Sequence, residues 1–211
     1  MWSFTCPSPE HLQRLIASQA TLDLTYPQVG VTASGTLPGY KVDDNRVLLG
    51  QGPEVFAAAC EALRKWRQFP APWTTIWPLP TPIAVGQTVA IVARAFGLWW
   101  ANTCRIVYVV DEPGRFGFAY GTLPQHVERG EERFLIERHE DGSVWYTIRA
   151  ISQARYWMVR LAYPLTRRLQ RRFARDSLAG MKAAVEEKLT TEAQRKNGTR
   201  IRRERMNSSD P

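Results

Sequence analysis

The groups in this sequence best suited to proton transfer gather between residues 120 and 132. This stretch holds one histidine, three carboxylates and two hydroxyl groups: Tyr120, Thr122, His126, Glu128, Glu131 and Glu132. A histidine beside carboxylates suits general acid–base catalysis, because its ordinary pKa of about 6.5 allows proton exchange near neutral pH. His126, Glu128 and Glu132 are therefore candidates for proton transfer, although no residue is established as catalytic. The same groups could instead form hydrogen bonds and ion pairs at a strand end.

Three arginines lie within runs that resemble β-strands: Arg94, Arg105 and Arg149. An arginine pointing into the protein needs a carboxylate partner or an anionic ligand to offset its desolvation. Pairing with Glu128 or Glu132 would therefore mark a cavity. The opposite orientation is also open, because antiparallel sheets commonly keep one face in water.

Large aromatic side chains offer a second set of candidate binding residues. Trp99, Trp100, Trp145 and Tyr146 could line a pocket or fill the core. Together with the polar groups, the candidate ligand-binding residues are Arg94, Trp99, Trp100, Arg105, Tyr120, Thr122, His126, Glu128, Glu132, Trp145 and Arg149.

The first third of the chain predicts two helices and one strand. A short helix over residues 11–20 follows Pro9, and the glycine- and proline-rich stretch 26–40 predicts a loop. A short strand over residues 45–50 leads into a helix that starts at Gly52-Pro53-Glu54 and stops before Pro70.

Residues 74–152 predict an antiparallel meander, because short runs rich in β-branched and aromatic residues alternate with turn signals. In a β-strand, residues two positions apart have their side chains on the same face, so Tyr120 and Thr122 point together. His126 and Glu128 also share a face if that stretch is extended. The expected strands are Thr74–Trp77, Thr88–Ala95, Thr103–Asp111, Phe116–Thr122, Glu131–Arg138 and Ser143–Ile151.

A final amphipathic helix is predicted from about Tyr163 to Leu189, since Leu161, Leu165, Leu169 and Phe173 recur every four residues. Residues 190–211 are polar and basic, which predicts a disordered tail. Residues 1–154 hold 13 Lys and Arg against 14 Asp and Glu, whereas residues 155–211 hold 15 against 6. The net charge of +8 therefore belongs to this helix and tail. The arginines from Arg167 to Arg175 could contact nucleic acid or an anionic surface, or form a solvated helix face.

Other features narrow the class of protein. Cys6, Cys60 and Cys104 lie far apart without ligand spacing, so neither a metal site nor a disulfide framework is indicated, and no cofactor is implied. The N-terminus lacks the pattern of a secretory signal, and the most apolar segment carries Arg94, Asn102 and Arg105. We therefore expect a cytoplasmic protein without a transmembrane segment. The oligomeric state is left open.

Six motifs together resemble one family. They are Tyr26-Pro-x-Val-Gly-Val-Thr, Trp66-Arg-x-Phe, Gly97-Leu-Trp-Trp-Ala-Asn-x-Cys-Arg, Phe116-Gly-Phe-Ala-Tyr-Gly-Thr-Leu-Pro-x-His126, Glu128-x-Gly-Glu-Glu-x-Phe134 and Leu169-Gln-Arg-Arg-Phe-Ala-Arg-Asp-Ser177. The chain thus resembles domain of unknown function 1990 (UPF0548-like proteins) over roughly residues 20–185. The resemblance implies a fold similar to the START and birch-pollen-allergen-like superfamily, and the family brings no established catalytic residues to carry over.

The expected fold is α+β: a curved antiparallel sheet of about seven strands grips a long C-terminal helix, with a second helix after the first strand. The expected organisation is an N-terminal helical extension (residues 1–22), one helix-grip domain (23–189) and the basic tail (190–211). Such a sheet and helix leave a space that side chains fill or a ligand occupies.

Three functions follow as hypotheses. The first is binding of a small apolar or amphipathic ligand between sheet and helix. The second is an enzyme on the same scaffold that uses His126 with Glu128 or Glu132 for proton transfer. The third is an adaptor for nucleic acid or an anionic membrane through the basic C-terminal helix.

Overall fold

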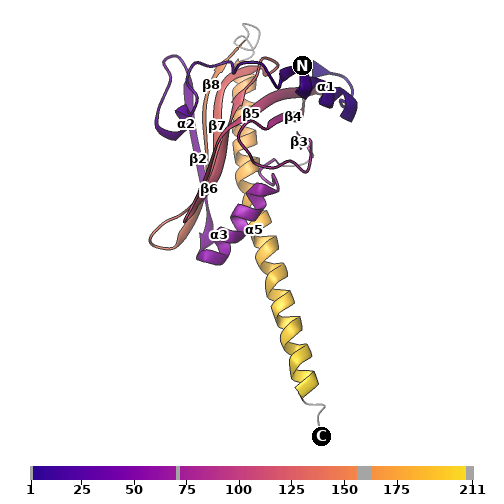
Figure 1. Ribbon diagram of the computed structural model, residues 1–211, viewed down its shortest axis with the longest axis vertical. Helices are drawn as coiled ribbons and strands as arrows, with labels where there is room; N and C mark the ends of the chain where they lie inside the picture. Colours follow the sequence, from indigo (N-terminus) through magenta and orange to yellow (C-terminus); the bar gives the residue numbers. More distant parts are fainter. Residues whose placement is uncertain (1, 70–71, 156–162, 208–211) are drawn as a thin grey trace.

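The computed structural model of the chain describes residues 2–69, 72–155 and 163–207, and it places eight strands in one antiparallel sheet (Figure 1). Along the sheet the strands run in the order β2, β8, β7, β6, β5, β4 and β3, while β1 pairs with β5. The strands are β1 (Trp2–Ser3), β2 (Lys41–Gln51), β3 (Thr74–Trp77), β4 (Thr88–Ala95), β5 (Leu98–Glu112), β6 (Arg115–Thr122), β7 (Glu128–Arg138) and β8 (Ser143–Ala154). The helices are α1 (Pro9–Gln19), α2 (Val31–Ser34), α3 (Pro53–Arg64) and α5 (Tyr163–Asn207).

The inner face of the sheet packs against α3 and α5. Phe118 and Phe134 are fully buried there, with ring centroids 5.4 Å apart, and Met181 and Val185 of α5 complete the cluster. Burying each such side chain contributes on the order of 1.5–3 kcal/mol. This core fills the space beneath the middle of α5, so any cavity must lie nearer its first turns.

The outer face of the sheet is covered by the N-terminal segment. Leu12 and Leu15 of α1 pack against the small side chains of β4 and β5. The start of α1 is fixed by Ser8, whose hydroxyl accepts a hydrogen bond from the His11 amide, and by Pro9 in the first turn. The N-terminal extension is therefore a helix plus a short strand, both joined to the sheet.

Glu131 fastens the chain around α2 to the outer face. Its carboxylate is buried and accepts hydrogen bonds from the Tyr26 hydroxyl (2.6 Å), the Gly30 amide (2.8 Å) and the Thr32 amide (2.9 Å). The Thr32 hydroxyl is a fourth donor to this carboxylate, and together the four hydrogen bonds offset the cost of burying it. Gly121 supports this contact, because a Cβ there would lie 2.4 Å from the Tyr26 hydroxyl oxygen.

The predicted α+β helix-grip fold is confirmed, and the strand boundaries differ mainly in length. Thr74–Trp77 and Thr88–Ala95 form the expected strands, while β2, β5 and β7 begin earlier than predicted. The residues added to β2 and β7 carry charge, and pairing with β8 overrides their weak strand propensity. In the stretch expected to be a loop, residues 31–34 form the short helix α2.

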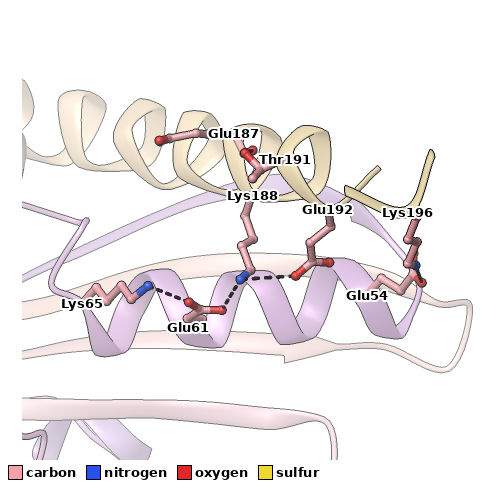
Figure 2. A network of polar contacts seen from close by, with 8 residues as sticks. All are labelled: Glu54, Glu61, Lys65, Glu187, Lys188, Thr191, Glu192 and Lys196. Atoms are coloured by element: carbon pink, nitrogen blue, oxygen red, sulfur yellow. Dashed lines mark hydrogen bonds and ion pairs between the residues drawn. The ribbon is translucent and has the colours of Figure 1, made fainter. Parts of the chain in front are cut away.

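The larger difference is at the C-terminus, where α5 continues to Asn207 and residues 190–207 are helical instead of disordered. Figure 2 shows a reason for the continuation: Lys188 lies 3.0 Å from Glu61 of α3 and 3.3 Å from Glu192, and Lys196 lies 3.2 Å from Glu54. Such pairs each contribute a few tenths of a kcal/mol. Residues 208–211 of the expected tail and Leu161 of the predicted apolar stripe lie outside the described residues.

Within the described part of the chain, no helix combines the length and apolar character needed to cross a membrane.

Candidate ligand-binding cavity

A cavity of about 710 Å³ lies between the inner face of the sheet and the first turns of α5. Apolar side chains form most of its wall, with Phe69, Trp73, Ile91, Ile148 and Phe173 contributed by five separate segments. This volume falls within the range of small-molecule sites, about 300–1,000 Å³. The cavity is therefore large enough for a ligand of that class.

A carboxyl group and a phenol form the polar centre of the wall. Tyr120 of β6 and Glu132 of β7 are register partners, and the Tyr120 hydroxyl donates a short hydrogen bond to the Glu132 carboxylate. Burial, opposed by the Tyr120 hydrogen bond and assisted by the nearby Glu128 carboxylate, raises the pKa of Glu132 to about 7. Glu132 therefore exchanges its proton near neutral pH.

Glu128 and Asp43 add two more carboxyl groups, each with a partner on α5. The Gln170 side-chain amide donates to Glu128, and Arg167 forms a two-point pair with Asp43, with one N–O distance of 2.6 Å. Burial raises the pKa of Glu128. These contacts hold the start of α5 across the strand ends, whereas the Glu132 carboxylate accepts its hydrogen bond from Tyr120 of the sheet.

His126 also faces the cavity, but its ring is hydrogen-bonded to the backbone of Glu128 instead of to the carboxylate of that residue. The backbone amide of Glu128 donates to its Nδ1 at 3.0 Å, because residues 124–127 form a turn instead of an extended strand. Burial lowers the pKa of His126 to about 4, so its ring is neutral at physiological pH. The expected pairing of His126 with Glu128 therefore takes place through the backbone.

The structure divides the candidate ligand-binding residues into two groups. Those that line the cavity are Trp100, Tyr120, Thr122, His126, Glu128 and Glu132. Those that do not line it are Arg94, Trp99, Arg105, Trp145 and Arg149.

The arginines lie away from the cavity. Arg105 donates to the carbonyl oxygens of Ala20 (2.7 Å) and Leu22 (2.9 Å), where it holds the chain after α1. Arg149 donates to the Gly35 carbonyl oxygen at 3.1 Å, and Arg94 is exposed. None of the three forms the inward pair with Glu128 or Glu132 that would have marked a cavity.

The tryptophans and Tyr146 follow the alternation of their strands. Trp99 packs against α1 on the outer face, while its neighbour Trp100 faces the cavity. Trp145 lies on the outer face under the Arg46 guanidinium, 4.8 Å from its ring centroid. Tyr146 is core, fully buried with its hydroxyl 3.0 Å from that of Ser177.

Several cavity residues were not singled out from the sequence. Ile148, Ala150 and Ser152 alternate along β8, so the period of two could have identified them once the inner face was known. Asp43 and Arg167 lie 124 positions apart, and no local pattern links them. Among the described residues, no three His, Cys, Asp or Glu side chains are arranged to hold a metal ion.

A curved antiparallel sheet closed by a C-terminal helix, with a cavity between them, defines a helix-grip protein. Residues 25–180 match the family described as "Domain of unknown function (DUF1990)". The chain belongs to this family, which confirms the resemblance drawn from its motifs.

The curated relatives of this chain are named UPF0548 proteins. A UPF0548 protein of Dictyostelium discoideum is 41% identical over 158 residues, covering 69% of this chain and 73% of that protein. A UPF0548 protein of Deinococcus radiodurans is 36% identical over 185 residues, covering 80% and 91%. Among solved structures, the ZhuI aromatase/cyclase of a Streptomyces species overlaps 71% of this chain and 96% of its own, with 13% identity and a TM-score of 0.49.

Proposed function

We propose that this protein binds a small, largely apolar molecule that carries a hydrogen-bonding group, in the cavity between the sheet and α5. The observation that supports this most is the combination of an apolar wall with the Glu132 carboxyl group, which lies in that wall beside the carboxyl groups of Glu128 and Asp43. An apolar wall supplies affinity, while a few polar groups fix the orientation of a ligand.

The chemistry of the polar centre favours a ligand with a hydroxyl or amine group. Glu132 with a pKa near 7 accepts a hydrogen bond when ionised and donates one when protonated. Arg167 is already paired with Asp43, and Arg171 is exposed to solvent, so the described part of the wall holds no buried, unpaired arginine to attract an anionic group. A neutral or weakly basic ligand is therefore preferred over an anionic one.

Titration with N-phenyl-1-naphthylamine, a neutral fluorescent probe with one N–H donor, tests the proposal. We expect saturable fluorescence enhancement with the native chain and about a tenfold weaker dissociation constant for Glu132→Leu, since one charge-assisted hydrogen bond is worth about 1.5–3 kcal/mol. Glu137→Leu, on the same strand but outside the cavity lining, is the matched control. Probe affinity that is equal in all three proteins would contradict the role of Glu132.

A second function, proton-transfer catalysis, is favoured by one specific observation. A carboxyl group with a pKa of about 7, enclosed in an apolar cavity, has the proton affinity that general acid–base catalysis requires near neutral pH. Glu132 then replaces His126 as the proton-transfer group, because the neutral His126 ring has a pKa of about 4. Turnover of a bound ligand that is lost in Glu132→Gln, while the ligand still binds, would distinguish an enzyme from a binding protein.

A further inference from the structure

The mouth of the cavity is surrounded by apolar side chains that face solvent. Trp2, Phe4, Phe96 and Leu165 are 55%, 79%, 58% and 41% exposed. They come from β1, the residues that follow it, the β4–β5 turn and α5, and these segments lie together at the end of the sheet where α5 begins (Figure 1). Three of the four line the cavity, and Phe4 packs edge-on against Trp2 with ring centroids 5.7 Å apart.

Phe96 is held outward by an unusual backbone. It occupies the first position of the two-residue turn between β4 and β5 with a φ of 55°, followed by Gly97 at 77°. Asparagine or glycine adopts this conformation at little cost, whereas a bulky aromatic residue is an outlier there. A strained, exposed phenylalanine contributes nothing to the core, so the feature is better explained by contact with a partner.

The same end of α5 carries unbalanced positive charge. Residues 163–175 contain five arginines and no acidic residue. Arg167 is paired with Asp43, and both Arg172 and Arg175 lie within 3.4 Å of Asp176. Arg168 and Arg171 are exposed, and within the described residues neither forms an ion pair.

We propose that these six residues, the cavity rim, dock on the surface of an anionic lipid bilayer. The cavity rim is Trp2, Phe4, Phe96, Leu165, Arg168 and Arg171. Aromatic side chains partition into the interface between headgroups and acyl chains, and each arginine beside an anionic leaflet adds on the order of 1 kcal/mol. This docking goes beyond ligand binding and does not require it.

The mixture of side chains favours a bilayer over a nucleic acid. A nucleic-acid site needs a track of cations along the phosphates together with flat stacking platforms. The rim has only two arginines without an ion pair, and its apolar side chains include Leu165 and come from separate segments. Such a ring is suited to an extended apolar layer behind negatively charged headgroups.

Flotation of the full chain with vesicles tests the proposal. We expect binding to vesicles of phosphatidylcholine and phosphatidylglycerol at 3:1, weaker binding to pure phosphatidylcholine, and a decline with added salt. Phe96→Asn, which suits the positive φ, and Arg171→Glu should each weaken binding to the anionic vesicles by roughly tenfold. Thermal unfolding of both variants, measured separately, shows that they are folded.

Matched controls locate the effect. Val85→Asn removes a comparably exposed apolar side chain in the β3–β4 connection, and Lys182→Glu reverses an exposed charge further along α5, so both should bind as the native chain does.

Three outcomes would overturn the proposal. The first is that the native chain does not bind anionic vesicles. The second is that vesicle binding is lost in Arg202→Gln/Arg203→Gln but not in Arg171→Glu, and the third is that the chain binds single-stranded RNA and Arg171→Glu abolishes this binding while vesicle binding persists.

Discussion

Ala150→Phe should weaken binding of N-phenyl-1-naphthylamine by roughly 100-fold, about 2.7 kcal/mol. Ala150 lies on the inner face of β8, where its register partners are Glu132 on β7 and Asp43 on β2. A benzyl group at this position projects across the cavity in front of the Glu132 carboxyl group. Because the cavity provides space, the larger side chain is accommodated with less strain than in a packed core.

Thr147→Phe is the control for this substitution. Thr147 lies on the same strand, on the outer face, and does not line the cavity. The control should keep the native affinity for the probe, and thermal unfolding of both variants verifies that each is folded. Equal affinities in Ala150→Phe and the native chain would show that the probe binds elsewhere.

Glu132→Gln should change how stability depends on pH by about 3 kcal/mol between pH 4.5 and 7. The pKa of Glu132 is about 7 in the folded protein, against an ordinary value of 4.5, so over this window the folded state binds more protons than the unfolded state. That excess makes the native chain lose stability as the pH rises. Glutamine has no proton to release, so the variant gains stability relative to the native chain as the pH rises.

His126→Asn should show the opposite trend. The pKa of His126 is about 4 in the folded protein, against an ordinary value of 6.5, so the native chain loses stability as the pH falls through this window. The variant, whose side-chain oxygen can still accept the Glu128 amide, should gain about 3 kcal/mol relative to the native chain between pH 6.5 and 4.

Urea unfolding at half-unit pH intervals measures both effects. Glu140→Gln, in the exposed turn before β8, is the control and should follow the native curve. Parallel curves for the native chain, Glu132→Gln and His126→Asn would contradict the buried, cavity-facing environment of both groups.

The order of strands and helices was predictable because the runs that form strands carry their own local signals. The runs Thr74–Trp77 and Thr88–Ala95 are bounded by prolines and glycines, which end strands through local backbone preferences. The motifs between Gly97 and His126 also indicated the family to which the chain belongs. The sheet, the C-terminal helix and the space between them all follow from such local information.

The composition of the cavity was only partly predictable, because alternation in a strand does not say which face is the inner one. Trp99 and Trp100 are adjacent, and only the second faces the cavity. Arg105 donates to backbone carbonyl groups after α1, and Arg149 donates to the Gly35 carbonyl group and pairs with Asp44. These partners lie far away in sequence, and no sequence pattern identifies them. The ion pairs between α5 and Glu54 and Glu61 likewise join residues that lie far apart in sequence.

Native mass spectrometry of the chain, purified without detergent from the cells that express it, tests ligand binding most directly. We predict a folded species carrying one small molecule that is released on denaturation, that partitions into organic solvent and that contains a hydroxyl or amine group. Ala150→Phe should lose this molecule and Thr147→Phe should retain it. A native chain that carries no small molecule and also fails to bind N-phenyl-1-naphthylamine would contradict the proposed function.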